Sequence, residues 1–488
     1  MVQFILLWLR AVIVRYLNVD VYGDAGEAMT DWDTLKKEVL EGLKPTMDEE
    51  TQLMVFADET VKKVNKVLMN SGIEGVAELH GSIAHGTWIS GQQDLDIFIV
   101  LDRYDNRGQL QDALDSVRNS IDWVFTEAYA EHPYLKTRHN GYSVDIVPCF
   151  RVNNGEKIIS STDRTPLHTR WLMDRIKGFE DEVRLLKQFL GNLDLYGAEI
   201  KIGGFSGYLC EILIVYYGGF WKLINAAKKW GAKEVLSFSE EETRKFNDPL
   251  VFIDPVDSRR NVASALREDS YGLFIAAARG FVNNPGMVFF MRESLDVSPE
   301  TMVEELRGRP TDILFLVIEE NKADMPDVLW GQIHKSRQAL ERQIDEHGFK
   351  VLRSTAWSNE ETRHIFVFEL DSGTIPEAVK HSGPPAHLEN NVRQFIEAYR
   401  DNPRTITGPD LFKDRWYVLL RREHVEIKAF MGVLLADGGR DIGVSKKLSV
   451  RLLQHHRVLL NEEIEDYLFD GFEDYLYDWL KGRPIWIE

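Results

Sequence analysis

Three aspartates in apolar segments are the residues of this chain best suited to chemistry. Asp94 and Asp96 belong to DLDIFIVL, whose apolar and β-branched residues predict a strand. Because side chains alternate between the faces of a strand, both carboxylates share one face, and Leu95 and Ile97 share the other. Carboxylates held together repel each other, and a bound divalent cation removes that cost. Oxygen ligands without a nearby cysteine suit Mg²⁺ or Mn²⁺.

The third aspartate, Asp145, lies in a second predicted strand, SVDIV, with the same alternation of faces. A neighbouring strand could bring Asp145 beside the pair, and three carboxylates can bridge two metal ions for in-line phosphoryl transfer. A pair of aspartates two residues apart is weak support by itself, because solvent-facing strand edges often carry one. The Gly81–Ser82 turn favours the catalytic interpretation, since such a turn before a helix presents N–H groups and a hydroxyl to a phosphate.

The combined pattern resembles the polymerase-beta-like nucleotidyltransferase superfamily: a Gly-Ser turn, eleven residues, the aspartate pair, and a distant strand aspartate. Longer segments narrow the resemblance to the archaeal, or class I, CCA-adding enzymes. These segments are HGSIAHGTWISGQQDLDIFIV, AEHPYLKTRHNGYSVDIVPCF, STDRTPLHTRWL, EVRLLKQFL, YGAEIKIGGFSGYLCEILIVYYGGF and DPVDSRRNVA. The likeness covers the chain except for about residues 1–28. It implies an enzyme that adds and repairs the 3′-terminal CCA of tRNA from CTP and ATP without a nucleic-acid template, releasing pyrophosphate.

The resemblance also implies which residues form the site. Asp94, Asp96 and Asp145 match the catalytic, metal-binding carboxylates, although the family also carries Glu at the first of these positions. Ser82 matches the residue that holds the triphosphate. The other matches to nucleotide-binding positions are His85, His168, Lys187, Tyr196 and Arg260.

His85 departs from the family pattern, which has an Arg in contact with the nucleotide at this position. A neutral His still donates one hydrogen bond but lacks the guanidinium fork. His132, in an E-H-P-Y motif, is also expected near the site, without a defined role.

Several of these residues have an ordinary structural interpretation as well. Lys187, in EVRLLKQFL, could be a surface lysine whose stem covers apolar side chains. His168 could be a histidine at a helix start, and Tyr196 a half-buried tyrosine. Arg259 could take part of the base-reading role given to Arg260.

The elements that must position these residues follow from hydrophobic periodicity. Residues 30–70 predict two helices, and the strands VAELH, DLDIFIVL and GYSVDIVPCF predict a small mixed α/β sheet. Residues 172–293 are expected to be mainly helical. Residues 294–425 contain DILFLVIEE, a helix around 326–346, KVLRSTAW and HIFVFEL. This β-α-β-β order predicts a ferredoxin-type sandwich, which RQFIEAYR and RWYVLLRRE could complete.

The predicted fold class is α+β multidomain, with a polymerase-beta-like nucleotidyltransferase head, a helical neck, a ferredoxin-like α+β body and a helical tail. A length of 488 residues favours two to four domains. The expected divisions are a non-essential extension at 1–28, a catalytic head at 29–171, a neck or central domain at 172–293, a tRNA-binding body at 294–425 and a tail at 426–488.

Composition limits the function classes. The net charge of −20 argues against a protein that coats nucleic acid, but it leaves room for a local basic groove. With two cysteines, Cys149 and Cys210, the chain has neither a disulfide framework nor a Cys-rich zinc site, as expected in a reducing cytoplasm. Arg10 and Arg15 interrupt the apolar N-terminal run and leave it too short to span a membrane.

The resemblance implies two Mg²⁺ ions, for which Mn²⁺ can substitute, and a homodimer that binds ATP, CTP and the acceptor stem and T arm of tRNA. Three other functions stay open. One is another polymerase of the superfamily, making poly(A) or oligoadenylate, which would add an A run without C. The second is a non-catalytic RNA-binding protein, but the presence of all three carboxylates argues against it. The third is a membrane-associated role through residues 1–28.

Overall fold

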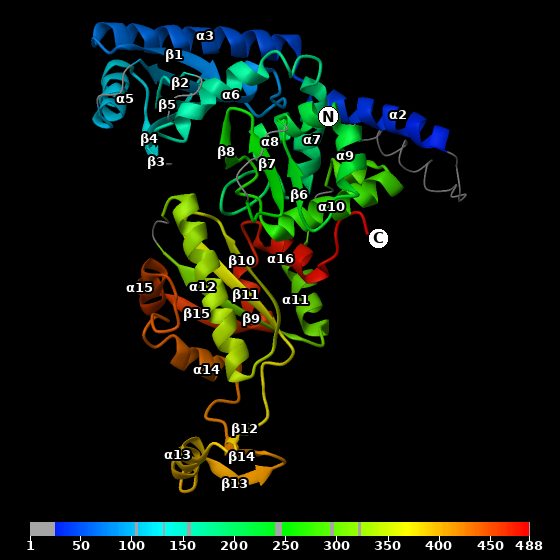
Figure 1. Cartoon of the computed structure of the whole chain (residues 1–488), viewed down its shortest axis with the longest axis vertical. Coiled ribbons are helices and arrows are strands. Elements are labelled where there is room, and N and C mark those ends of the chain that lie inside the picture. The colour runs from blue at the N-terminus through cyan, green and yellow to red at the C-terminus, as the bar shows by residue number, and fades with distance from the viewer. Residues whose placement is uncertain are drawn as a thin grey trace. The chain divides into compact units, whose positions relative to one another are not determined.

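The computed structural model describes residues 25–102, 106–129, 132–153, 158–239, 246–292, 297–320 and 324–487 (Figure 1). The predicted extension at 1–28 lies outside these residues except for its last four, which begin α2 (Ala25–Leu43). The chain forms two compact units. The first runs up to Arg292 and includes the chain end from Ile485, and the second holds the residues between them. The finer division into head, neck, body and tail stays a prediction.

The first unit begins with a five-stranded mixed sheet of order β1-β2-β5-β4-β3. β2 and β5 run parallel, and the other neighbouring strands run antiparallel. The bounds are β1 (Gly75–His80), β2 (Asp94–Leu101), β3 (Thr126–Tyr129), β4 (Pro133–His139) and β5 (Tyr142–Phe150).

Two helices cover one face of this sheet, α3 (Met47–Asn70) and α5 (Gly108–Ser120) (Figure 1). α3 starts at a capping box formed by Thr46 and Glu49, which satisfies backbone N–H groups of its first turn. Leu95 and Ile97 are fully buried against these helices. The predicted alternation along β2 is therefore confirmed, and the aspartates lie on the face that these helices leave uncovered.

The rest of the first unit is a helical core with a small sheet. Its elements are α4 (Gly81–His85), η1 (Thr162–Arg164), α6 (Thr165–Leu172), α7 (Glu180–Asn192), α8 (Gly207–Tyr217), α9 (Phe220–Ala227), β6 (Glu234–Leu236), β7 (Leu250–Asp254), β8 (Asp257–Asn261), α10 (Glu268–Asn283) and η2 (Met287–Phe289). Near the chain end, Trp486 stacks on Phe289 with a centroid distance of 5.5 Å.

The expectation of a mainly helical region at 172–293 missed the sheet β6-β7-β8. The physical reason is visible in the two longer strands. β7 (LVFID) is a short run that is buried throughout, and β8 (DSRRN) is almost wholly polar, so neither shows the alternation that marks a strand.

The second unit contains a four-stranded antiparallel sheet of order β10-β11-β9-β15. Its β-α-β-β-α-β sequence and strand order are ferredoxin-like, as predicted. The elements are β9 (Asp312–Glu319), α12 (Pro326–His347), β10 (Val351–Ser358), β11 (Arg363–Leu370), α15 (Lys446–Gln454) and β15 (His456–Leu460), preceded by α11 (Pro299–Gly308).

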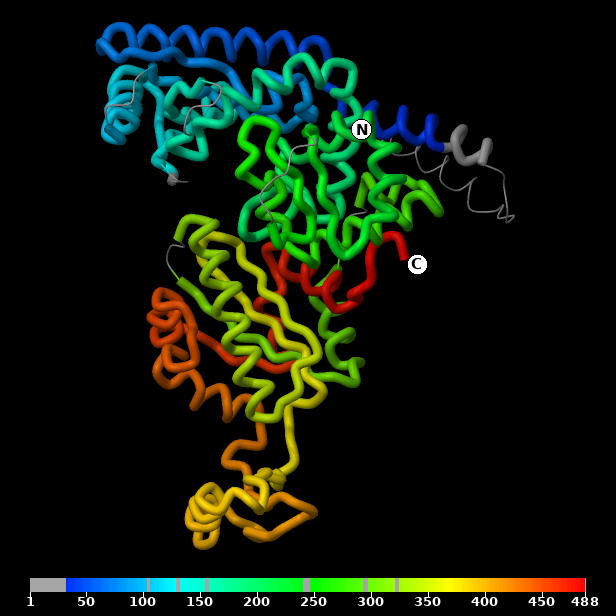
Figure 2. Tube along the Cα trace, in the orientation of Figure 1, coloured from blue at the N-terminus to red at the C-terminus, as the bar shows by residue number. Residues whose placement is uncertain are grey.

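A second, three-stranded sheet interrupts the ferredoxin-like order between β11 and α15 (Figure 2). It consists of β12 (Ala378–Pro385), β13 (Thr405–Phe412) and β14 (Arg415–Arg421), with α13 (Glu389–Tyr399). RQFIEAYR and RWYVLLRRE belong here, so the expectation that they complete the sandwich was wrong. β9 is buried along most of its length and needs a neighbour on each side, which β15 supplies.

The C-terminal stretch 426–488 was expected to be helical, and β15 is the exception to that expectation. Its helices are α14 (Ile427–Leu434), α15, η3 (Asn461–Tyr467) and α16 (Phe472–Lys481). In the described part of the chain, no helix is both long and apolar enough to cross a membrane.

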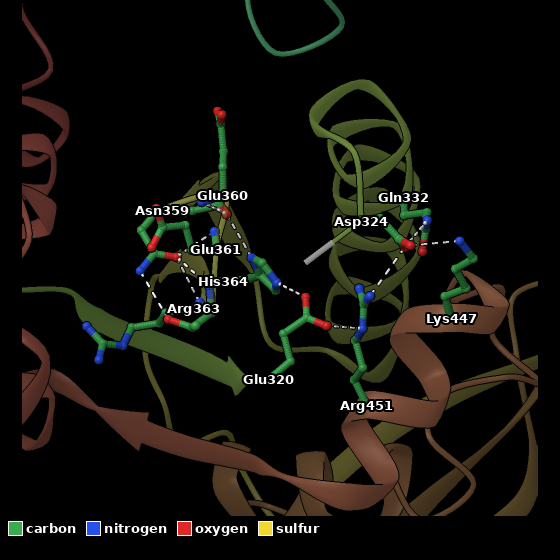
Figure 3. Close-up of polar contacts among 12 residues, drawn as sticks. Glu320, Asp324, Gln332, Asn359, Glu360, Glu361, Arg363, His364, Lys447 and Arg451 are labelled. Carbon is green, nitrogen blue, oxygen red and sulfur yellow. Dashed lines mark hydrogen bonds and ion pairs between the residues drawn. The ribbon is translucent and has the colours of Figure 1, made fainter. Parts of the chain in front are cut away.

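Polar side chains fasten α15 to the end of the ferredoxin-like sheet (Figure 3). Glu320 accepts a hydrogen bond from Arg451 Nε at 2.6 Å and lies 2.5 Å from His364 Nε2. Asp324 pairs with both Arg451 and Lys447, at 3.3 and 2.8 Å. Together with the buried Leu448 and Leu452, these contacts attach a helix that is separated from β9 by more than a hundred residues of sequence.

Candidate functional site

The strand register gathers the predicted carboxylates at one place on the open face of the five-stranded sheet. Asp96 and Asp145 are direct partners across the parallel pair β2 and β5. His80 is the partner of Asp96 on one side, and Lys136 is the partner of Asp145 on the other. Asp94 lies two residues before Asp96 on the same face and is exposed. The sheet therefore brings together a row of four polar side chains, with the two carboxylates at its centre and a basic residue at each end.

Gly81 permits a close approach that no other residue would allow. Its φ is +69°, in the left-handed region, and a Cβ there would lie 2.0 Å from Asp96 Oδ2. α4 therefore starts directly against the Asp96 carboxylate, with Ser82 in its first turn. The N-cap residue His80 donates or accepts no side-chain hydrogen bond at this helix start. The geometry leaves the turn beside the carboxylates suited to a phosphate group.

Burial and mutual repulsion make these carboxylates unfavourable as anions. Burial, with the charges of Asp145 and Asp94, raises the pKa of Asp96 to about 7. Burial also raises the pKa of Asp145, although Lys136, 3.3 Å away, opposes that shift. Asp145 Oδ1 is buried without a hydrogen-bond partner among the described residues. A bound cation would satisfy this oxygen and offset the repulsion, so the carboxylates fit a divalent metal ion.

The side chains by themselves do not form a closed metal cage. Among the residues that the structure describes, no group of three or more His, Cys, Asp or Glu side chains is gathered closely enough to hold an ion. Mg²⁺ is commonly held by one or two carboxylates together with phosphates of the substrate. An ion at this face would therefore take part of its coordination from a nucleotide.

Four buried polar residues form a network behind the turn. His85 Nδ1 lies 3.0 Å from Glu211 Oε1, and Thr87 donates to the same oxygen at 2.6 Å. Lys187 Nζ donates to the Thr87 carbonyl at 3.1 Å. Burial raises the pKa of Glu211, but His85 and Lys187 lower it by more, so this carboxylate stays ionised. The network ties α4 to α7 and α8.

This network shows the surroundings of two residues that were predicted to bind the nucleotide, Lys187 and His85. Lys187 is only 4% exposed, so the interpretation as a surface lysine is wrong. Both ring nitrogens of His85 are engaged, since Nε2 lies 3.2 Å from Thr169 Oγ1. A nucleotide contact by His85 would require one of these bonds to break. Its visible effect is to hold α4 in place.

A second cluster joins two residues that were predicted separately. Asp254, 1% exposed, accepts a hydrogen bond from Arg260 Nη1 at 2.8 Å and lies 2.9 Å from His168 Nε2. The His168 ring stacks on Tyr208 at 3.9 Å, and the Tyr208 hydroxyl has no hydrogen-bond partner in the described part of the chain. One buried carboxylate therefore orients both predicted nucleotide-binding side chains.

Arg259, next to Arg260 in the sequence, forms its hydrogen bond with a different aspartate. Its Nε donates to Asp257 Oδ1 at 3.1 Å, and Asp257 also accepts from Arg164. The Arg259 side chain is 66% exposed, whereas that of Arg260 is 34% exposed. The two adjacent arginines point to different partners, and only Arg260 shares a carboxylate with His168.

The remaining predicted residues lie around these clusters. Tyr196 is half-buried, and burial, then the charges around it including that of Asp94, raises the pKa of its hydroxyl. Tyr196 therefore lies within electrostatic range of the carboxylate face. His132 is 8% exposed, and its Nε2 is buried without a hydrogen-bond partner in the described residues.

The sequence reasoning missed Glu211, Asp254 and Lys136. Two of them carried a signal, because Glu211 sits in the apolar run GYLCEILIVYY and Asp254 ends the apolar run LVFID. A charged residue in such a run is rarely buried unless it is paired, which points to a basic partner. Lys136 carried no signal, since only the strand register places it beside Asp145.

Three families match successive parts of the chain. Residues 61–168 match a nucleotidyltransferase domain, and residues 181–291 match the second domain of tRNA nucleotidyltransferases. Residues 309–460 match the C-terminal domain of CCA-adding enzymes. The carboxylate face falls in the first match, and Asp254 and Arg260 fall in the second.

Curated relatives match over almost the whole chain. A CCA-adding enzyme of Methanosarcina mazei is 33% identical over 92% of this chain and 98% of its own length. One from Pyrobaculum neutrophilum is 34% identical over 84% of this chain and 95% of its own length. One from Haloarcula marismortui is 31% identical over 93% of this chain and 99% of its own length. Among solved structures, CdnC of E. coli MS115-1 with ATP matches 53% of this chain and 94% of that chain at 17% identity and a TM-score of 0.43.

Proposed function

This chain belongs to the CCA-adding enzymes, a family of tRNA nucleotidyltransferases, and we propose that its active site is the carboxylate face of the five-stranded sheet. The reaction adds C, C and A to the 3′ end of tRNA from CTP and ATP and releases pyrophosphate. The observation that carries the assignment of the site is the register that sets Asp96 opposite Asp145, with the Gly81 turn against Asp96.

Nucleotidyltransferases of this kind depend on divalent metal ions, and we propose two Mg²⁺ ions, for which Mn²⁺ can substitute. Asp94, Asp96 and Asp145 would hold them together with the triphosphate, consistent with carboxylates that fall short of a closed cage. Bound there, the ions would stabilise negative charge on the attacking and leaving oxygens.

The chain's own groups position the two substrates. The Gly81–Ser82 turn binds the triphosphate, so pyrophosphate leaves on the β1 side of the carboxylates. Asp145 assists removal of the 3′-hydroxyl proton.

The cluster around Asp254 is proposed to read the nucleotide. Arg260 presents donors to the base, and His168 contacts the sugar or base beside it, with Asp254 fixing the orientation of both. Lys187 and Tyr196 are proposed to complete the nucleotide site. A side chain already oriented by a buried carboxylate loses less entropy when it binds.

We expect Asp254→Ala to lower kcat/KM for both CTP and ATP by about tenfold to a hundredfold, the cost of losing one or two oriented hydrogen bonds. Steady-state kinetics with tRNA held in excess would measure it. Asp257→Ala is the matched control, because Asp257 lies in the same hairpin and its loss frees Arg259 of that hairpin and Arg164 of η1. An equal loss in both variants would mean that the hairpin fold, not Arg260, controls nucleotide binding.

A nucleotide-incorporation experiment tests the proposed function. The protein is incubated with tRNA lacking its CCA end, CTP, ATP and Mg²⁺, and the added ends are sequenced. We expect C, C and A in that order. An A run without C would assign the chain to a poly(A)-type polymerase. No addition at all would favour the alternative that the chain is a non-catalytic RNA-binding protein.

The family gives tRNA and nucleoside triphosphates as substrates. We further propose contact with the acceptor stem and T arm, a homodimer, and a location in the cytoplasm. Sedimentation of the purified protein would measure its oligomeric state.

A further inference from the structure

β4 presents a line of polar side chains beside the carboxylates. Leu135 and Thr137 are buried, whereas Lys136 and Arg138 are exposed, so the strand alternates with its cations on the open face. Lys136 is the register partner of Asp145, and Arg138 is the partner of Ser143, which in turn pairs with Asp94. The two cations therefore run level with the three aspartates, one strand farther across the sheet.

The strand order fixes the direction from which the attacking group must come. The order is β1-β2-β5-β4-β3, and the triphosphate-binding turn follows β1. In-line displacement places the attacking oxygen opposite the leaving oxygen. If pyrophosphate leaves over β1, the 3′ hydroxyl arrives over β5 and β4. The RNA strand behind that hydroxyl must then cross β4.

We propose that Lys136 and Arg138 bind phosphates of the 3′-terminal nucleotides of the acceptor strand and align its hydroxyl with Asp145. This inference rests on the proposed function and names the surface that the growing end follows. A phosphate ligand needs local cations, because a chain of net charge −20 otherwise repels RNA. Exposed cations on the attacking side meet that need.

The present contacts of the two side chains are consistent with this role. Lys136 Nζ lies 3.3 Å from Asp145 Oδ2 and 5.5 Å from the centre of the Tyr134 ring, yet its side chain is 50% exposed. Arg138 forms no hydrogen bond or ion pair with any described residue and is exposed. Arg138 is unpaired among the described residues, and Lys136 keeps half of its side chain exposed although it pairs with Asp145, so both side chains can reach a ligand.

The test uses the full chain with Lys136→Met, Arg138→Met and, as the matched control, Arg151→Met. Arg151 follows the far end of β5 and pairs with Asp102, so its loss changes the net charge equally but away from the carboxylates. Affinity for tRNA lacking CCA is measured without nucleotides at several salt concentrations. KM for tRNA and for CTP is measured separately, and thermal unfolding confirms folding.

We expect each β4 variant to weaken tRNA binding by about threefold to tenfold and to flatten the salt slope by about 0.7 to 1, the value for one lost phosphate contact. KM for CTP should stay at the wild-type level in the β4 variants. Binding of tRNA by Arg151→Met should also stay at the wild-type level, and Lys136→Arg should restore the affinity for tRNA that Lys136→Met loses. Equal weakening in Arg151→Met would overturn the proposal. So would a Lys136→Met variant with lower kcat but unchanged affinity and slope, which would act through Asp145 alone. A wild-type protein that binds tRNA but adds no CCA would refute the proposed function instead.

Discussion

Replacing Asp96 with Asn should lower nucleotide incorporation about a thousandfold, because stabilisation of the transferring group by metal-bound charge is worth several kcal/mol. Asp96 lies at the centre of the site, opposite Asp145 and against the Gly81 turn. The amide keeps the size of the carboxylate, so the fold is retained while the metal ligand is lost. The measurement is single-turnover addition of CTP to tRNA lacking CCA. Asp58→Asn, on the exposed side of α3, is a matched control that should retain full activity.

The same substitution should stabilise the metal-free protein at high pH. Burial and like charges raise the pKa of Asp96 from 3.8 to about 7 in the folded chain. The unfolded chain therefore releases this proton first, and folded stability falls as pH rises between these values. The Asp96→Asn variant has no group that titrates at this position, so its stability does not fall in this way as pH rises. In EDTA at pH 8 its melting temperature should exceed that of the wild type, and the difference should shrink near pH 4 or with added Mg²⁺. A lower melting temperature at pH 8 would contradict repulsion at this site.

The parts of the site that depend on local alternation could be predicted from the sequence. Asp94 and Asp96 share one face of β2, and Leu95 and Ile97 lie on the other face, in the core, as the geometry of a single strand requires. The pairing of Asp96 with Asp145 was a hypothesis only, since register between distant strands is set by the whole sheet.

The parts of the site and of the fold that depend on long-range pairing could not be predicted from the sequence. Glu211 contacts His85 and Thr87, which lie 126 and 124 residues away in the sequence, and Lys187 reaches Thr87 across 100 residues. Apart from Glu211, the helix that carries it is almost wholly apolar. β15 is similar, because HRVLL is too short and irregular to predict its place beside β9. In each case, tertiary contacts decide what a local pattern leaves open.

A Gly81→Ala variant should lose about a hundredfold in incorporation rate although it removes no functional group. Its Cβ would lie 2.0 Å from Asp96 Oδ2, so the carboxylate or the start of α4 must move. A displacement of about 1 Å at a reacting centre can cost about a hundredfold. The left-handed φ of +69° adds a folding cost of about 1 to 2 kcal/mol for any residue with a Cβ. Single-turnover kinetics and thermal unfolding would measure the two effects separately.

Gly86→Ala separates the carboxylate contact from the backbone cost. Gly86 ends the same short helix with a φ of +70°, but its nearest neighbour to a new Cβ is Glu180 Cγ at 3.7 Å, an ordinary contact. Both variants should therefore lose the stability that a left-handed φ costs, with a further loss in Gly81→Ala from the contact with Asp96, and only Gly81→Ala should lose activity. Equal loss of activity in both would mean that the orientation of α4, rather than its contact with Asp96, sets the rate. A large loss in Gly81→Ala alone would tie catalysis to the position of one carboxylate.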